Sequence, residues 1–264
     1  MPLLSPNALA GTYNHPSKDP WEAVLLYREA MRRNPDWGAS RVASDINADT
    51  TNDFEGVSRS ELRSWVDGDG MPDAARAIKV ADDLGWLADE WTPTTRSLAQ
   101  LVAGVFACGS VNKAGWVPGW AVRNVRCELE AALGQVGVGH QWLGRESATQ
   151  GDELRPANHG SILGRALVVA GVPVGDKTDA TVRGLPDWLD DAPPSVRSSF
   201  AELLVAERGS KRPGKATLAI QANRSRQYFE DVRDLLEDVT GESVTASDAG
   251  VTISADAVRA LGLA

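Results

Sequence analysis

Residues 101–110 read LVAGVFACGS and residues 200–210 read FAELLVAERGS. Each segment mixes apolar and small residues, so each can form a helix that crosses a partner at short range. Both end in Gly-Ser, where a turn from helix to strand is expected. The pair therefore predicts two related helices, over 95–108 and over 196–207, with Ser195 as the N-cap of the second.

The segments that follow these two helices have the same order. After the first helix we expect a hairpin over 110–123, a helix over 124–137, strands within 140–160 and a helix over 161–171. After the second we expect a hairpin over 210–222, a helix over 225–240, strands over 243–247 and 250–254, and a helix over 255–262. A repeat of about 100 residues is too long for a solenoid and indicates a pseudo-dimer of two αββαββα halves with an approximate two-fold axis.

The N-terminal part of the chain is predicted to be helical only. Residues 1–19 have no periodic pattern and are expected to form a mobile tail. Helices are predicted from Pro20 to the break at 34–36, over 39–48, after the N-cap Ser58, and from Pro72 to Leu84. The predicted domains are a helical domain over 20–92, a first half over 93–171, a linker over 172–193 and a second half over 194–264, which together make an α+β protein.

Charge is unevenly distributed along the chain. The net charge is −9, yet residues 93–127 and 208–229 contain no Asp or Glu and together carry +10, which leaves −19 for the rest. We interpret this as an acidic surface around a basic working face, so the acidic total does not exclude a nucleic acid partner. The alternative is that the windows are core elements, where acids are rare, but this explains Lys211, Arg212 and Lys215 poorly.

Composition limits the class of protein further. Apolar content of 42% and charged content of 24% are ordinary for a folded chain. Two cysteines cannot build a disulfide framework, and no CxxC pair is present for zinc. We expect no secretory signal and no membrane span, and therefore a cytoplasmic protein, nucleoid-associated and compatible with a halophile.

The paired segments resemble the LAGLIDADG homing endonucleases in their single-chain form with two motif copies. The segment between the copies supports this, with GVPVGDKT at 171–178, Leu185-Pro186, Trp188 and Ala192-Pro193. The resemblance implies that the two motif helices pack along a two-fold axis and that the two sheets form a saddle over duplex DNA. It also implies one acid at the end of each motif helix, which holds Mg²⁺ for hydrolysis of the two strands.

The sequence departs from that pattern at the acids. The position matching the first acid is Cys108, a poor ligand for a hard cation, and the position matching the second is Glu207. Glu207 is the candidate catalytic residue and Mg²⁺ ligand if the protein is active, and otherwise a solvated carboxylate at a helix end. Cys108 is interpreted as a small packed residue.

Candidate DNA contacts come from the basic windows and from the helical domain. Three short helices resemble a homeodomain-like helix-turn-helix, whose third helix would present Arg59 and Arg63 to the major groove. In the two halves the candidates are cations and amides, which bind phosphates and base edges: Lys113, Arg123, Arg126, Lys211, Arg212, Lys215, Gln221, Arg224 and Arg226.

Three functions therefore compete. The first is a sequence-specific protein that binds duplex DNA as a monomer, has impaired cleavage, and serves in recognition or regulation. The second is an active or nicking Mg²⁺-dependent homing endonuclease that uses Glu207. The third is a protein-interaction scaffold without DNA binding.

Overall fold

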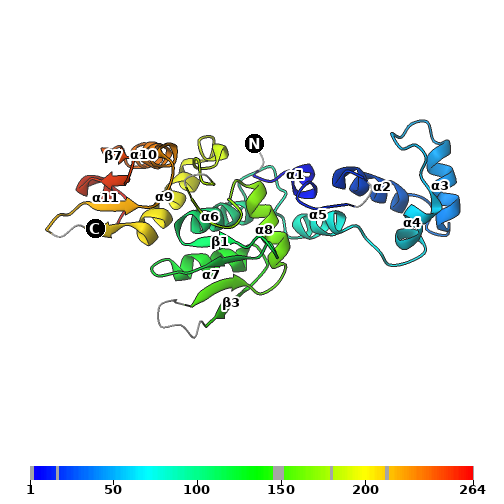
Figure 1. Cartoon of the computed structure of the whole chain (residues 1–264), viewed down its shortest axis with the longest axis horizontal. Coiled ribbons are helices and arrows are strands. Elements are labelled where there is room, and N and C mark those ends of the chain that lie inside the picture. Colours follow the sequence, from blue (N-terminus) through cyan, green and yellow to red (C-terminus); the bar gives the residue numbers. More distant parts are fainter. Residues whose placement is uncertain (1–2, 16–17, 145–151, 179–180, 212–213, 264) are drawn as a thin grey trace. The chain divides into compact units, whose positions relative to one another are not determined.

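The chain divides into two units, a helical unit over Ser5–Asp83 and a larger double unit made of Met1–Leu4 and Leu84–Ala264. The computed structural model describes residues 3–15, 18–144, 152–178, 181–211 and 214–263 (Figure 1). Helices occur throughout these residues, and the strands form two four-stranded antiparallel sheets. The predicted α+β class is therefore confirmed.

Segment 84–92 belongs to the double unit, whereas the sequence predicted a boundary after Thr92. Trp86 is fully buried, and its indole Nε1 donates a 2.8 Å hydrogen bond to the carbonyl of Val136. A Cβ at Gly137 would lie 2.7 Å from a methyl group of Leu84. These contacts join the segment to residues 136 and 137 of the first half, about 50 residues further along the chain. No local sequence pattern could reveal contacts at this separation.

The helical unit contains α1 (Pro6–Ala10), α2 (Pro20–Arg32), α3 (Ala39–Ala48), α4 (Arg59–Val66) and α5 (Asp73–Asp83). The four longer helices were predicted at these places. Helix α1 was not, because residues 1–19 were expected to be a mobile tail. Leu9 and Ala10 are fully buried, and α1 packs against α5 and α2, so burial of two apolar side chains fixes this short helix.

Helices α2, α3 and α4 share one hydrophobic core. Leu26 of α2, Ile46 of α3 and Leu62 of α4 are fully buried in it, and Trp65 packs against it. Asn47 orders the polar insertion before α4, because its side-chain amide accepts from the Val57 N–H at 2.9 Å and donates to the Val57 carbonyl at 2.8 Å. The Ser58 hydroxyl then accepts from the Glu61 N–H, as predicted for an N-cap.

The first half of the double unit contains α6 (Pro93–Ala107), β1 (Gly109–Val111), β2 (Pro118–Trp120), α7 (Arg126–Gln135), β3 (His140–Leu143), β4 (Glu153–Pro156) and α8 (Gly160–Val169). Its sheet has the order β1-β2-β4-β3. After the short helix η1 (Asp187–Leu189), the second half contains α9 (Pro194–Arg208), β5 (Ser210–Lys211), β6 (Leu218–Gln221), α10 (Arg226–Thr240), β7 (Val244–Ser247), β8 (Gly250–Ile253) and α11 (Ala255–Ala260). Its sheet has the order β5-β6-β8-β7, so the predicted tandem αββαββα topology is present.

One cap in the second half differs from the expectation. Helix α9 begins at Pro194 after the N-cap Pro193, with no side-chain cap, so Ser195 lies inside the helix. Proline is suited to the first helical position because it has no N–H to satisfy and its φ is already helical.

Two glycines allow the sheet of the first half to approach α6. A Cβ at Gly109 would lie 2.5 Å from Cδ1 of the fully buried Trp120, and one at Gly104 would lie 3.0 Å from its Nε1. The small residues of the opening motif are therefore needed where the indole ring lies against the helix. None of the helices within the described ranges has the length and apolar character needed to cross a membrane.

Candidate nucleic-acid interface

The two motif helices, α6 and α9, pack against each other in the double unit. The Gln100 amide donates a 2.8 Å hydrogen bond to the Ser199 hydroxyl, and the rings of Phe106 and Phe200 lie with centroids 6.3 Å apart. The C-terminal ends of the two helices lie close enough for their charges to interact. Glu207 and Arg208 at the end of α9 both shift the pKa of Cys108 at the end of α6.

Glu207 is neither a solvated carboxylate nor an open metal ligand. Its side chain is buried and accepts from three successive backbone N–H groups, those of Arg123 at 3.0 Å, Asn124 at 2.8 Å and Val125 at 3.3 Å. The Asn124 side chain also donates to the Ala206 carbonyl at 2.8 Å. The carboxylate thus caps the N-terminus of α7 from the opposite half, where a negative charge is favourable.

The two halves differ in how this helix start is capped. Helix α7 has Val125 as its N-cap, with no side-chain hydrogen bond, whereas α10 has Ser225, whose hydroxyl accepts from the Tyr228 N–H. Val125 cannot satisfy the free N–H groups, so an acceptor must come from elsewhere. Glu207 provides it, and α10 needs no such partner.

Strand register corrects the alignment of the two motifs. Gly109 lies opposite the core-facing Trp120, and in the second half Gly209 precedes Ser210, which lies opposite Ala219, next to the core-facing Ile220. The Gly-Ser pairs are therefore equivalent. Counting back from them, Cys108 matches Arg208 and Glu207 matches Ala107, so the sequence alignment of Cys108 with Glu207 was displaced by one residue.

Cys108 is partly buried, and the charges of Lys177, Arg208 and Arg123 act on it. Burial, with a further contribution from the Glu207 charge, raises the pKa of the Cys108 thiol to about 12. Lys177, from the segment between the halves, donates its ammonium group to the carbonyls of Val105 and Phe106 at the end of α6. Burial, together with the charges of Arg224 and Arg208, lowers the pKa of Lys177 to about 7.

These residues do not fit Mg²⁺. Both oxygens of Glu207 accept from backbone N–H donors, Cys108 is a protonated thiol, and the other charged groups acting on Cys108 are cations. Hard cations require several oxygen ligands. Within the described ranges, no group of three or more His, Cys, Asp or Glu side chains could hold a metal ion.

The predicted DNA contacts of the double unit differ in how far they remain available to a partner. Arg126 pairs with Glu130 at 3.0 Å and stacks on Trp142, and Arg226 pairs with Glu230 at 2.8 Å and with Asp248 at 3.1 Å. Lys113, Arg123, Lys211, Lys215 and Gln221 have exposed side chains. Arg224 is half-buried, and Arg212 lies outside the described residues.

Pleating decides which strand residues face away from the helices, because directly paired residues share a face. Lys211, a predicted DNA contact, pairs with Leu218, whose side chain is buried on the helix side, so Lys211 does not lie on the open face. Gln221 does, and it shares the open face of the second sheet with Ser210, Thr245, Ser247 and Thr252. These five side chains are polar and uncharged.

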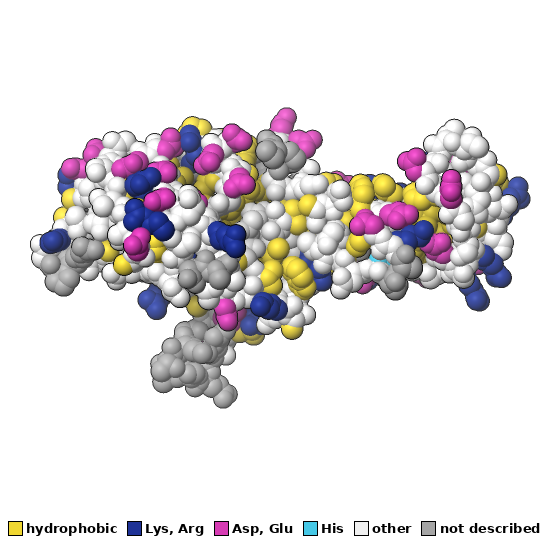
Figure 2. Space-filling view, turned by 45° about the horizontal axis from the view of Figure 1, so that its top comes forward, with side chains coloured by type: hydrophobic (Ala, Val, Ile, Leu, Met, Phe, Trp, Pro, Cys, Tyr) yellow, Lys and Arg dark blue, Asp and Glu magenta, His cyan; other side chains and the backbone are white. Residues whose placement is uncertain are grey.

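The open face of the first sheet contains charged residues of both signs. Ser110, Gln141 and Arg155 lie on it by register, as does Glu153, which pairs with Arg155 at 3.1 Å and lies over Gly119. Figure 2 likewise shows Lys and Arg side chains interspersed with Asp and Glu on the surface that it draws. The sheet faces therefore offer hydrogen-bonding groups more than a continuous basic surface.

The helical unit presents Arg59 and Arg63 as predicted. Both are exposed on α4, while Leu62 is buried on the opposite face of the helix. Arg33 of the same unit is bound internally, since it pairs with Glu29, Asp45 and Asp49. Helix α4 therefore presents two exposed cations on one face that are open to a partner.

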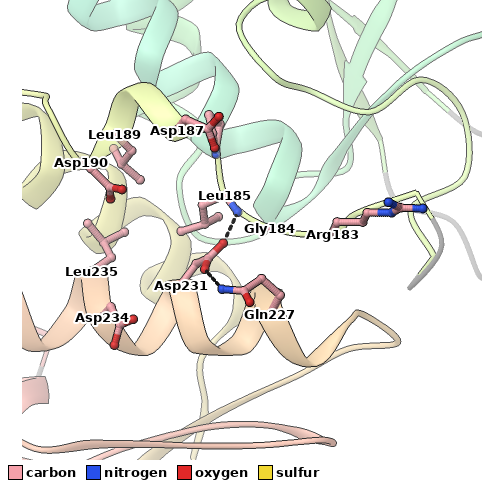
Figure 3. A pocket seen from close by; sticks show the side chains of 11 residues that line it. Arg183, Gly184, Leu185, Asp187, Leu189, Asp190, Gln227, Asp231, Asp234 and Leu235 are labelled. Carbon is pink, nitrogen blue, oxygen red and sulfur yellow. Dashed lines mark hydrogen bonds between the residues drawn. The ribbon is translucent and has the colours of Figure 1, made fainter.

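The segment that joins the two halves, residues 172–193, is called the inter-repeat segment. A recess of about 450 Å³ lies between its residues 183–190 and α10 (Figure 3). Asp231 accepts from the Leu185 N–H at 2.8 Å and from the Gln227 amide at 2.7 Å. Asp187, Asp190 and Asp234 add negative charge to the lining. The recess is acidic and Asp231 holds the inter-repeat segment in place, so it does not contribute to a DNA-binding surface.

Sequence reasoning missed Lys177 and Arg208 as site residues. Lys177 was quoted only as part of the inter-repeat segment, and Arg208 only as part of a basic window. Their proximity depends on the packing of α6 against α9, which no local pattern encodes. No protein-family model and no curated protein sequence matches the chain.

Proposed function

We propose that the protein binds duplex DNA through the double unit, in the manner of a LAGLIDADG-type fold, and recognises a sequence without cutting it by a metal-dependent route. The observation that carries this proposal is the duplicated sheet. Two halves of identical strand order expose polar faces with Gln141, Arg155 and Gln221, whose groups suit the edges of bases in a major groove. Exposed Lys113, Arg123 and Lys215 supply contacts to the phosphates.

The absence of cleavage follows from the use of Glu207. Its carboxylate satisfies the start of α7, and the matching position in the other motif is Ala107. Hydrolysis of both strands by paired metal-bound acids needs a free carboxylate at each motif end. A role in recognition or regulation fits this chemistry.

Selection of bound duplexes from a random library is the first test of the proposal. An enriched sequence, followed by a steep loss of affinity as salt rises, is the expected result. A flat salt response or no enrichment would refute DNA recognition and favour the scaffold function.

Two variants divide the interface into its parts. Lys215→Glu should weaken binding to all sequences and lower the salt slope by roughly one, whereas Gln221→Ala should relax specificity at one base position. Arg233→Glu, which changes the charge equally on the surface of α10, is the matched control. Equal effects of Lys215→Glu and Arg233→Glu would mean that net charge alone drives binding.

Cleavage is tested with supercoiled DNA and either Mg²⁺ or Mn²⁺. We expect no product. Nicked or linear product that disappears in Glu207→Gln would establish the nuclease instead.

The helical unit is proposed as a second DNA contact, similar to a helix-turn-helix, through α4. Arg63→Glu should then weaken binding of the selected duplex, while Arg76→Glu, on α5 of the same unit, should not. Equal affinities of the two variants would assign this unit to another partner.

A further inference from the structure

Three cations gather where the ends of α6 and α9 meet the inter-repeat segment. They are Lys177 of the inter-repeat segment, Arg208, which is the last residue of α9, and Arg224, which lies just before α10. They interact electrostatically, because Arg224 and Arg208 each lower the pKa of Lys177, and Arg208 lowers that of Arg224. Like charges held this close destabilise one another unless an anion lies among them.

The chain supplies little to neutralise them. The acid nearby, Glu207, is occupied by the N–H groups of residues 123–125. Among the salt bridges between described residues, none involves Lys177, Arg208 or Arg224. The cluster therefore retains excess positive charge at a place that is partly shielded from water.

The arginine side chains are held in place by backbone carbonyls. Arg224 donates from Nη1 to the carbonyls of Lys177 and Asn223, and Arg208 donates from Nη2 to the carbonyl of Gln221 at 3.2 Å. A guanidinium has five N–H donors, so each keeps donors for a further acceptor. Orientation by fixed carbonyls lowers the entropic cost of binding that acceptor.

We propose that Lys177, Arg208 and Arg224 form a binding site for one backbone phosphate of duplex DNA. The site rests on the DNA-binding function proposed above and adds a chemical property to it. Phosphate is a compact anion that accepts from guanidinium and ammonium groups together. The site needs no divalent metal, because Lys177 provides positive charge at the end of α6.

Binding at this site should take up a proton. Burial and the two arginines lower the pKa of Lys177 to about 7, so near neutral pH part of the population has a neutral amine. A phosphate favours the ammonium form and raises that pKa in the complex. The affinity is therefore highest below pH 7 and falls as the pH rises, by at most about tenfold per pH unit.

Other groups around Lys177 do not produce the same response. The Cys108 thiol stays protonated because its pKa is raised to about 12, and a guanidinium group does not lose its proton over the range tested. Glu207 faces Cys108 from α9 but is held by backbone donors. The pH response should thus depend on Lys177.

The experiment measures the affinity of the full chain for a 30-base-pair duplex by fluorescence anisotropy between pH 6 and pH 8.5 at constant ionic strength. The wild type should lose about tenfold or more in affinity over this range. Lys177→Met should bind more weakly at pH 6 and show a flat profile, and Lys177→Arg should bind tightly with a flat profile. Lys79→Met, on α5 of the helical unit, is the matched control and should follow the wild type.

Each other outcome has a distinct meaning. Parallel pH profiles for the wild type and Lys177→Met overturn the site but leave DNA binding intact. No binding of duplex by the wild type at any pH refutes the proposed function and, with it, a DNA phosphate as the ligand. In that case, stabilisation of the wild type but not of Lys177→Met by inorganic phosphate would identify a site for the free ion.

Discussion

In the first half of the double unit, α7 begins at Val125, which offers no side-chain acceptor, and Glu207 of the second half supplies one. In the second half, α10 follows Ser225, whose own hydroxyl accepts from the Tyr228 N–H at 3.1 Å. The halves share their strand order and their helix order. They differ in whether the start of the middle helix is capped from within the half or from the other one.

This difference explains why one motif helix ends in an acid and the other does not. The acceptor at position 207 satisfies three backbone donors at the start of α7, whereas the start of α10 is already capped by Ser225 of its own half. The carboxylate is therefore accounted for by structure before any catalytic role is assigned. It also ties the second half to the first, because a group of α9 completes a helix of its neighbour.

The largest expected contrast lies between the two cysteines. Cys108 is the C-cap of α6 and is partly buried, whereas Cys127 is exposed on α7. The rise of the Cys108 pKa from 9.0 to about 12 lowers its thiolate fraction at pH 8 roughly a thousandfold. With a thiol reagent under native conditions, Cys127 should react promptly and Cys108 only after unfolding. Prompt reaction of Cys108 in the Cys127→Ser variant would show that the end of α6 is open to the reagent.

The capping difference itself is tested by Glu207→Gln. Loss of the carboxylate leaves buried N–H groups poorly satisfied, so the free energy of unfolding should fall by about 1–3 kcal/mol. Urea unfolding measures this fall. Glu202→Gln, an exposed position on the same helix, is the control and should change stability by less than about 0.5 kcal/mol. Equal stabilities of the two variants would mean that α7 does not depend on the other half.

The topology was predictable from the sequence, and the chemistry at the motif ends was not. Apolar periodicity, Gly-Ser turns and hairpin spacing are local, and they placed the α-helices of the double unit and both strand pairs of each half to within a few residues, although not the short helix η1. Glu207 meets its donors across more than 80 residues, and Lys177 reaches α6 across about 70. Such pairs depend on how α6 and α9 pack, so neither the cap nor the cation cluster could be derived from spacing.

The second half offers the reciprocal test, Ser225→Ala. This substitution removes the local cap of α10, and because one donor in a partly exposed helix start is affected, the expected loss is about 1 kcal/mol. The same urea measurement applies, with Ser195→Ala, inside α9 and without a capping role, as the control. A loss as large as that of Glu207→Gln would erase the distinction between the two kinds of cap.

The final comparison concerns Lys177, whose ammonium group donates to backbone carbonyls at the end of α6, whereas the Ala206 carbonyl at the end of α9 accepts from the neutral Asn124 amide. Its pKa is about 7 in the folded chain and 10.5 in an ordinary environment. The unfolded chain therefore binds more protons than the folded one between these values, and stability gains with rising pH in that window. Relative to Lys177→Met, the wild type should gain about 2–3 kcal/mol in stability from pH 6.5 to pH 9, which corresponds to about 5–8 °C in Tm. The comparison is made without DNA and with no phosphate in the buffer, since an anion at the cluster would oppose the gain. A constant difference in Tm between the two proteins would mean that the lysine keeps its charge in the folded state, and the end of α6 would then be as well solvated as the surface around it.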